Sequence, residues 1–326
     1  MTTRRAILRV LGAGALIAGT LSASGQQRPK LYRVGILSSD VAQDPRVAEI
    51  RDGLRALGYT EGQNLVVDFR WADGNLERLP DLAAELISNN VDVIVTLGAA
   101  VWAAKRQTTT VPIVVAFSGD LLNVGVVSDL ARPGGNITGL SLMSPDLAAK
   151  RLELLKEAFP RIARVAILYD PDEVATVPEK RETETAARKL GVTVQPLESR
   201  HSDDLGRVFA AATRERADAF IVFAHAFAYR NRDRIIDLVK QYGLPAMYGW
   251  RVFVESGGLM SYGPNVQAVV GRAAIYVDRI LKGAKPGDLP VEQPTEFKLV
   301  INLKTAKELG LAIPPSVLAR ADDLIQ

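Results

Sequence analysis

The chain has 326 residues, of which 48% are hydrophobic and 24% are charged, and this is enough apolar material for two globular cores. Its net charge of +3 is too small to predict a nucleic-acid or anionic-membrane partner. There is no cysteine, and the two histidines are far apart, so we expect no disulfide, no cysteine nucleophile, no lipid-modified cysteine and no metal site.

The first 25 residues differ from the rest of the chain. Three arginines precede the apolar run LGAGALIAGTL, and the small residues SASG follow it. This order is typical of a secretory signal peptide, and the run is shorter than the about 20 residues that span a membrane. The stretch TRRAILR also resembles a twin-arginine export signal, although a general secretory signal can carry two arginines by chance. We predict a signal peptide at 1–25 and a periplasmic mature protein, in which 37 basic residues balance 37 acidic ones.

From residue 31 onward, strand and helix patterns alternate. Apolar or alternating runs predict strands at 32–37, 64–72, 91–98 and 111–119, and helical spacing predicts helices at 45–59, 76–90 and 99–107. Alternation of this kind indicates βαβ units, with helices on both faces of a parallel sheet.

The same pattern then begins again. Segments 164–173, 183–200 and 217–226 are similar, in the same order, to 33–40, 49–70 and 91–100. Apolar strands and Leu-Gly helix ends are common in all α/β units, so each single match is weak. The ordered run of three matches favours an internal duplication and two similar doubly wound lobes.

Three connectors rich in Gly or Pro, near 134–142, 258–265 and 288–298, are candidates for chain crossings between the lobes. They predict a first lobe of 31–137 plus 264–292 and a second lobe of 138–263 plus 293–326. A long helix is expected at 266–282 and a strand at 297–303. Three crossings would form a hinge, in which a few residues absorb the dihedral changes of closure.

Four stretches carry a family resemblance: SDLARPGGNITGLS (128–141), RVAILYDP (164–171), LPAMYGWRVFVESGGLMSYGPN (244–265) and LPVEQPTEFKLVINLKTAKELGLAIPPSVLARAD (289–322). With them the chain resembles the ABC-transporter substrate-binding proteins of the type 1 periplasmic-binding fold, in the branch that includes tryptophan-binding members. Two positions depart from the family. Ser118 begins a Ser-Gly-Asp-Leu stretch where members often have Asp-Pro, and Asp170-Pro171 replaces a frequent Asn-Pro, so ligand identity does not carry over.

The resemblance implies a monomeric receptor that works with an ABC permease in the inner membrane. Together with an expected anion site at a helix start, it implies a small carboxylate-bearing ligand, such as an amino acid or an aromatic or branched acid. The ligand would shift the population of lobe arrangements toward the closed one.

The position of the site can be expected from the fold, because ligands of open α/β sheets bind beyond the carboxyl ends of the strands. In the first lobe this rule selects Ser38, Asp40, Thr96, Gly98, Ala99, Ala100, Ser118 and Asp120. In the second lobe it selects Asp170, Glu173, His225, Tyr248 and Arg251, and Tyr262 lies on a crossing.

Each candidate has a ligand role and a structural alternative. The Gly98-Ala99-Ala100 stretch predicts an anion site at a helix N-terminus, or else tight packing of strand and helix. The aspartates would bind an ammonium group or cap a helix. The tyrosines would line the ligand or pack at the hinge, Arg251 would bind a carboxylate or bridge the lobes, and His225 would contact ligand or be a hydrogen-bonded structural residue.

Two other classes of function have less support in the sequence than a receptor. An exported α/β enzyme lacks support, because no GxGxxG follows a strand of the mature chain and neither a P-loop nor a GxSxG motif is present. We therefore expect no cofactor. A ligand-sensing module would need a DNA-binding or transmembrane segment, and the predicted elements include neither.

Overall fold

The computed structural model describes residues 30–42, 44–173 and 176–326. The predicted signal peptide lies outside the described residues. Residues 31–326 form one compact unit built on two sheets.

The first sheet has five parallel strands in the order β2-β1-β3-β4-β5. The strands are β1 (Tyr32–Ser38), β2 (Leu65–Trp71), β3 (Val93–Leu97), β4 (Ile113–Phe117) and β5 (Ile137–Gly139). Strands β3 and β4 are buried along their whole length, as expected for central strands that helices cover on both faces.

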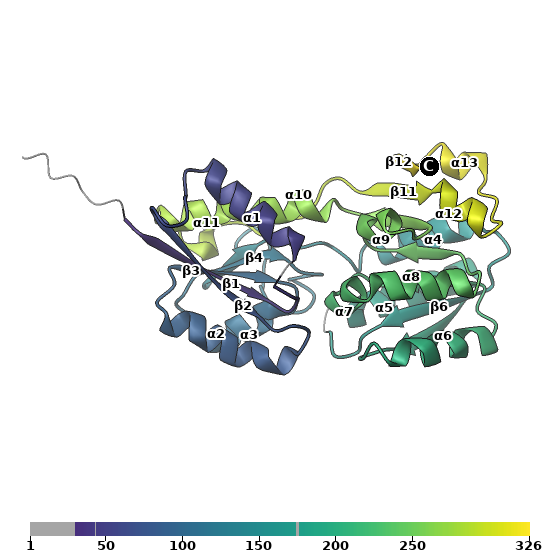
Figure 1. Ribbon diagram of the computed structural model, residues 1–326, viewed down its shortest axis with the longest axis horizontal. Coiled ribbons are helices and arrows are strands. Elements are labelled where there is room, and N and C mark those ends of the chain that lie inside the picture. Colours follow the sequence, from purple (N-terminus) through teal and green to yellow (C-terminus); the bar gives the residue numbers. More distant parts are fainter. Residues whose placement is uncertain (1–29, 43, 174–175) are drawn as a thin grey trace, which may run out of the picture. The chain divides into compact units, whose positions relative to one another are not determined.

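Helices cover both faces of this sheet. They are α1 (Pro45–Ala56), a short η1 (Leu76–Arg78), α2 (Leu79–Ser88), α3 (Ala100–Gln107), α10 (Val266–Gly271) and α11 (Ala273–Leu281). Helices α2 and α3 enclose one apolar cluster, and α1, α10 and α11 pack together on the other face. Figure 1 shows α10 and α11 beside α1, although almost the whole second lobe separates them in sequence.

The helix expected at 266–282 is interrupted at Arg272. Gly271 ends α10, and glycine inside a helix favours a break because it has no side chain to restrict the backbone. A Cβ on Gly53 of α1 would stand 2.7 Å from the Cβ of Ala274, so close packing at this point depends on the glycine.

The second sheet has seven strands in the order β12-β11-β10-β9-β8-β6-β7. They are β6 (Arg164–Tyr169), β7 (Thr193–Glu198), β8 (Ala219–Val222), β9 (Ala246–Tyr248), β10 (Met260–Gly263), β11 (Lys298–Asn302) and β12 (Asp323–Ile325). Strand β10 runs antiparallel to β11, so one pair departs from the predicted parallel arrangement. From β7 to β10 the order β7-β6-β8-β9-β10 repeats that of the first sheet, which confirms two similar α/β lobes.

The remaining helices belong to the second lobe or to its connections. They are α4 (Ala148–Ala158), α5 (Thr176–Leu190), α6 (Asp204–Arg214), α7 (Ala226–Arg230), α8 (Arg232–Gln241), α9 (Arg251–Glu255), η2 (Pro286–Asp288), α12 (Leu303–Glu308) and α13 (Pro315–Leu318).

The chain passes between the sheets after β5, after β10 and before β11, which are the three connectors singled out in the sequence. Two of these passages require glycine. A Cβ on Gly139 would stand 2.2 Å from the Val115 carbonyl oxygen, and one on Gly263 would stand 2.2 Å from that of Gly249. The predicted lobe boundaries stay a proposal. The assignment of each strand to one of the two sheets supports these boundaries.

A buried arginine of α4 forms hydrogen bonds to the backbone near two of these crossings. The Arg151 guanidinium donates to the backbone oxygens of Tyr262 at 2.8 Å and Ser144 at 3.3 Å, and forms an ion pair with Glu179 at 2.5 Å. Burial of this pair raises the pKa of Glu179 to about 7, while the ion pair opposes that rise. The hinge region therefore rests on an ion pair away from solvent.

Candidate ligand-binding site

Loops at the carboxyl ends of strands from both sheets enclose a cavity of about 30 Å³. The first lobe provides residues that follow β1, β3 and β4, and the second lobe provides residues that follow β6, β8 and β9. Leu142 comes from the first crossing. The lining residues are Asp40, Gly98, Phe117, Ser118, Gly119, Leu142, Glu173, Ala224, His225, Ala226 and Trp250.

Five of the residues selected from the sequence meet at this cavity: Asp40, Gly98, Ser118, Glu173 and His225. They come from loops far apart in the chain, as the strand-end rule predicted.

Several hydrogen-bond donors lie near the start of helix α3, next to the cavity-lining residue Gly98. Gly98 adopts a φ of +64°, and a Cβ there would stand 3.1 Å from Ser39 Oγ. No side chain caps the first turn of the helix, which begins after Ala99. The hydroxyls of Ser39 and Thr96 are buried and have no hydrogen-bond partner among the described residues. Buried polar groups without partners are costly, so this arrangement suits an anionic or hydroxyl-bearing ligand group.

Asp40 is buried, and a guanidinium group pairs with each of its carboxylate oxygens. Arg46 Nη2 lies 2.5 Å from Oδ2, and Arg230 Nη1 lies 2.8 Å from Oδ1. Arg46 belongs to α1 of the first lobe, whereas Arg230 ends α7 of the second. Asp40 therefore links the two lobes by an ion pair.

The Arg46 guanidinium is surrounded by aromatic rings from both lobes. Its Cζ lies 4.6 Å from the ring centre of Phe117, 4.3 Å from that of Tyr229 and 5.6 Å from that of Trp250. Burial disfavours the charge of Arg46, but hydrogen bonds and ion pairs with Asp44 and Asp40 outweigh it and raise the pKa. Cation–π contacts of this kind strengthen when water is excluded.

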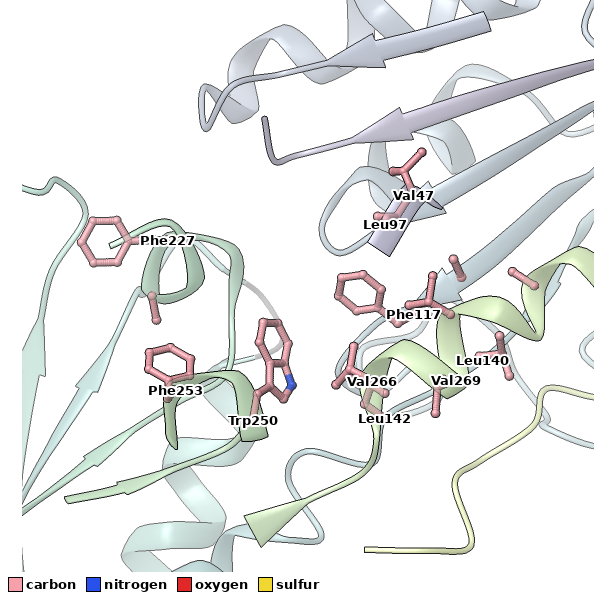
Figure 2. Packing of buried hydrophobic residues seen from close by; sticks show 14 of the residues in the cluster. Val47, Leu97, Phe117, Leu140, Leu142, Phe227, Trp250, Phe253, Val266 and Val269 are labelled. Carbon is pink, nitrogen blue, oxygen red and sulfur yellow. The ribbon is translucent and has the colours of Figure 1, made fainter. Parts of the chain in front are cut away.

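Trp250 and Phe117 form the apolar contact between the lobes beside Arg46. Their ring centres lie 6.0 Å apart in an edge-to-face arrangement. Figure 2 shows Trp250 on the second lobe facing Phe117 and Val266 across the interface.

Glu173 is a buried carboxylate with no hydrogen bond or ion pair in the described part of the chain. Burial, with repulsion from Asp170 and Asp40, raises its pKa to about 7, and Arg230 partly offsets the rise. Glu173 also lines a second cavity of about 280 Å³, whose walls include Leu76, Trp102 and Arg106. It thus lies between the inner cavity and a wider outer one.

His225 is buried at the cavity, and neither of its ring nitrogens has a partner among the described residues. Burial, with the nearby charge of Arg230, lowers its pKa to about 3, so the ring is neutral at pH 7. A neutral imidazole offers one donor and one acceptor. These unpartnered nitrogens favour ligand contact over the alternative of a hydrogen-bonded structural histidine.

Two of the selected first-lobe residues have local hydrogen-bond partners, and a third is part of helix α3. Ser38 Oγ accepts the backbone N–H of Asp40 at 3.0 Å, and Asp120 accepts the backbone N–H groups of Leu122 and Asn123. Ala100 is buried within the first turn of α3. A ligand role for their side chains stays a prediction.

The remaining selected residues of the second lobe also have structural partners. Asp170 accepts the backbone N–H of Asp172. Tyr248 is buried against Phe253, and its hydroxyl has no hydrogen-bond partner in the part of the chain that the structure describes. Arg251 forms ion pairs with Glu255 and Asp323. Tyr262, which lies on β10, packs beside Phe297. These four residues do not line the inner cavity, and their ligand roles stay predictions.

Arg46 and Arg230 were not among the selected residues. Arg46 follows Asp44-Pro45 at the start of α1, and Arg230 ends a five-residue helix after His225. The position of Arg46 at the start of a helix that follows a strand end is only a weak indication of a role at the site. Nothing in the sequence indicates that both arginines meet Asp40.

Within 30–42, 44–173 and 176–326, no three His, Asp or Glu residues are grouped so as to hold a metal ion. None of the helices in that part of the chain has the length and apolar character needed to span a membrane.

Comparisons with known proteins agree on one family. The family model "ABC transporter substrate binding protein" matches residues 34–325. A curated relative, the tyrosine-binding protein of Clostridioides difficile, is 24% identical over 288 residues, which cover 86% of this chain and 82% of the relative.

Two solved structures are similar over almost the whole chain. A conserved domain protein from Vibrio cholerae has a TM-score of 0.85 at 30% identity, covering 90% of this chain and 100% of that one. An ABC domain from Streptococcus pneumoniae in complex with L-Trp has a TM-score of 0.84 at 28% identity, covering 91% and 100%. The predicted type 1 periplasmic-binding fold is confirmed. The chain belongs to the family of ABC transporter substrate binding proteins.

Proposed function

We propose that the mature chain is a periplasmic receptor that binds a small amino acid or related carboxylate between its lobes and delivers it to an ABC permease. The observation that carries this proposal is a set of buried polar groups without partners at the interface of the lobes: Ser39, Thr96 and His225. His225 lines the cavity to which both lobes contribute, and Ser39 and Thr96 lie close in sequence to its lining residues Asp40 and Gly98. Relatives described as tyrosine-binding and as bound to L-Trp support an amino-acid ligand.

Each ligand group has a matching place in this proposal. The carboxylate binds at the N-terminus of α3, to the Ser39 and Thr96 hydroxyls and the first backbone N–H groups of the helix. The ammonium group pairs with Asp40 and Glu173, the two carboxylates that line the cavity. Phe117 and Trp250 contact the ligand's apolar part.

Binding requires the lobes to move. A cavity of about 30 Å³ is far smaller than the roughly 300 Å³ at the lower end of typical small-molecule sites. The lobes therefore separate to admit the ligand and close on it, and the ligand stabilises the closed arrangement by contacts to both lobes. The permease recognises that arrangement.

The receptor acts as a monomer, without cofactor or nucleic acid, and returns its ligand chemically unchanged. Export through a signal peptide at 1–25 places it in the periplasm. The absence of a nucleophile, metal or cofactor motif in the sequence supports binding rather than catalysis.

A thermal-shift screen of the mature protein tests the proposal. A ligand at a hundredfold excess over Kd stabilises the folded state by about 2.7 kcal/mol. We expect stabilisation by one or a few L-amino acids, and no change in the ligand after incubation. Stabilisation only by sugars or purines would contradict the ligand class, and conversion of the ligand into a product would instead support an exported enzyme.

A further inference from the structure

Arg230 belongs to the second lobe, but its guanidinium binds loops of the first. Nη1 donates to Asp40 Oδ1 at 2.8 Å and has a longer contact of 3.5 Å to the Ser39 carbonyl oxygen. A Cβ on Gly74, in the loop after β2, would stand 2.8 Å from Arg230 Nη2. In this position the guanidinium lies where a side chain at residue 74 would be.

The two cations on Asp40 are held very differently. Arg46 is buried, pairs with Asp44 as well as Asp40, and stacks on aromatic rings. Arg230 has a side chain that is 21% exposed, and within the described residues Asp40 is its sole ion-pair partner. Of the two, Arg230 is the cation that can leave Asp40 without breaking other ion pairs.

Asp40 Oδ1 is also the atom that a ligand's ammonium group needs. Asp40 and Glu173 line the cavity, and Arg230 is close enough to affect the charge of Glu173. If a guanidinium leaves and an ammonium group replaces it, the number of charges in the buried cluster is unchanged. The exchange therefore avoids leaving a buried carboxylate unpaired, which would be costly.

We propose that Arg230 occupies the position of the ligand's ammonium group, so that an amine-bearing ligand binds by displacing Arg230 from Asp40. This inference rests on the proposed function, and it narrows the ligand class to zwitterionic α-amino acids. Arg230 then competes with the ligand and sets its affinity. A carboxylate without an amine leaves Arg230 in place.

Isothermal titration calorimetry on the mature protein tests this directly. The probes are L-tyrosine and L-tryptophan, together with their deamino analogues 3-(4-hydroxyphenyl)propionate and indole-3-propionate. The variant is Arg230→Gln, and the control is Arg234→Gln, an exposed arginine of α8 whose nearest carboxylate, on Asp203, is 4.0 Å away. We expect Arg230→Gln to bind the amino acid about fivefold more tightly than wild type. Neither the analogues nor the control should show that gain.

Three results would overturn the inference. Weaker binding of the amino acid by Arg230→Gln would show that Arg230 holds the ligand, and an equal gain for amino acid and analogue would show no competition at the ammonium position.

Small-angle X-ray scattering without ligand supplies a test independent of binding. We expect a larger radius of gyration for Arg230→Gln than for Arg234→Gln, and equal radii would show that the ion pair does not link the lobes in solution. Absence of binding by every protein, with the expected radii, would contradict the proposed function rather than the Asp40–Arg230 contact.

Discussion

In the proposed site, buried hydroxyls such as that of Thr96 are expected to contribute strongly to ligand affinity. Thr96 Oγ1 is buried and has no hydrogen-bond partner among the described residues, so without ligand it costs stability rather than adding to it. A hydrogen bond from such a hydroxyl to a charged ligand group contributes about 1.5–3 kcal/mol.

Replacement of Thr96 by valine, which has the same shape without the hydroxyl, should therefore weaken binding of an amino acid by roughly tenfold or more. The free energy of unfolding without ligand should not fall and should rise by up to about 1–3 kcal/mol, because a buried hydroxyl without a partner is removed and no intramolecular hydrogen bond is lost. Calorimetric titration and urea denaturation measure the two quantities. A large loss of stability with unchanged affinity would show that Thr96 has a structural role.

Glu173 makes the free energy of unfolding of the ligand-free protein depend on pH. Its pKa in the folded state is raised from 4.5 to about 7, chiefly by burial, so the folded protein holds this proton more tightly than the unfolded chain does. The protonated Glu173 carboxyl therefore contributes to the stability of the folded protein below pH 4.5, and this contribution is lost as pH rises toward 7. Compared with Glu173→Gln, wild type should lose about 1 to 3 kcal/mol of unfolding free energy across this window.

Chemical denaturation of both proteins at several pH values measures that difference. Glu179 also has a raised pKa, but it is present in both proteins and cancels. A difference between the two proteins that does not change with pH would show that Glu173 is not the titrating group.

At the residue scale the sequence predicted the place of the site better than its chemistry. Asp40, Ser118 and His225 reach the cavity because they follow buried strands, and strands are visible in an apolar pattern. The charge partners of Asp40 were not predictable. Arg46 and Arg230 reach it through the packing of α1 and the meeting of two lobes, and neither is encoded by local spacing.

The elements at the hinge are held together by the buried pair of Arg151 and Glu179. Arg151 ties α4 to the backbone near two crossings, so its loss affects several segments at once. Removal of one partner from a buried pair leaves an uncompensated charge and costs about 3–5 kcal/mol.

Arg151→Met should therefore destabilise the protein by about that amount, and Arg151→Met with Glu179→Leu should recover a large part of the loss. Urea denaturation of wild type, the two single variants and the double variant forms a complete cycle. If the double variant is less stable than Arg151→Met by the full cost of Glu179→Leu, the two residues act independently and this description of the hinge is wrong.

At the element scale the repeated βα units were predictable, because buried strands and amphipathic helices have different periods. The short strand β5 and the antiparallel pairing of β10 with β11 were not. Three residues carry no usable period, and strand direction depends on where the chain returns after η2. The break at Arg272 follows Gly271, and the close packing of Gly53 of α1 against Ala274 of α11 is not visible in the sequence of either helix alone.

For the whole molecule, two lobes with the same strand order follow from the duplication, and three crossings follow from the Gly- and Pro-rich connectors. The contact between the lobes depends on loops from both halves. Phe117 ends β4 and Trp250 follows β9, and their edge-to-face contact joins the lobes. The residue contacts across the interface of the lobes therefore could not be predicted from the sequence.

We propose that the cleft between the lobes binds an amino acid with the help of the buried hydroxyls of Ser39 and Thr96. Calorimetric titration of the mature protein with L-amino acids, compared with the double variant Ser39→Ala with Thr96→Val, tests it most directly. We predict one ligand per chain for wild type, with a negative heat-capacity change from buried apolar surface, and binding at least about tenfold weaker for the variant. Equal affinity in the two folded proteins would contradict the site, and no binding of any amino acid would contradict the function.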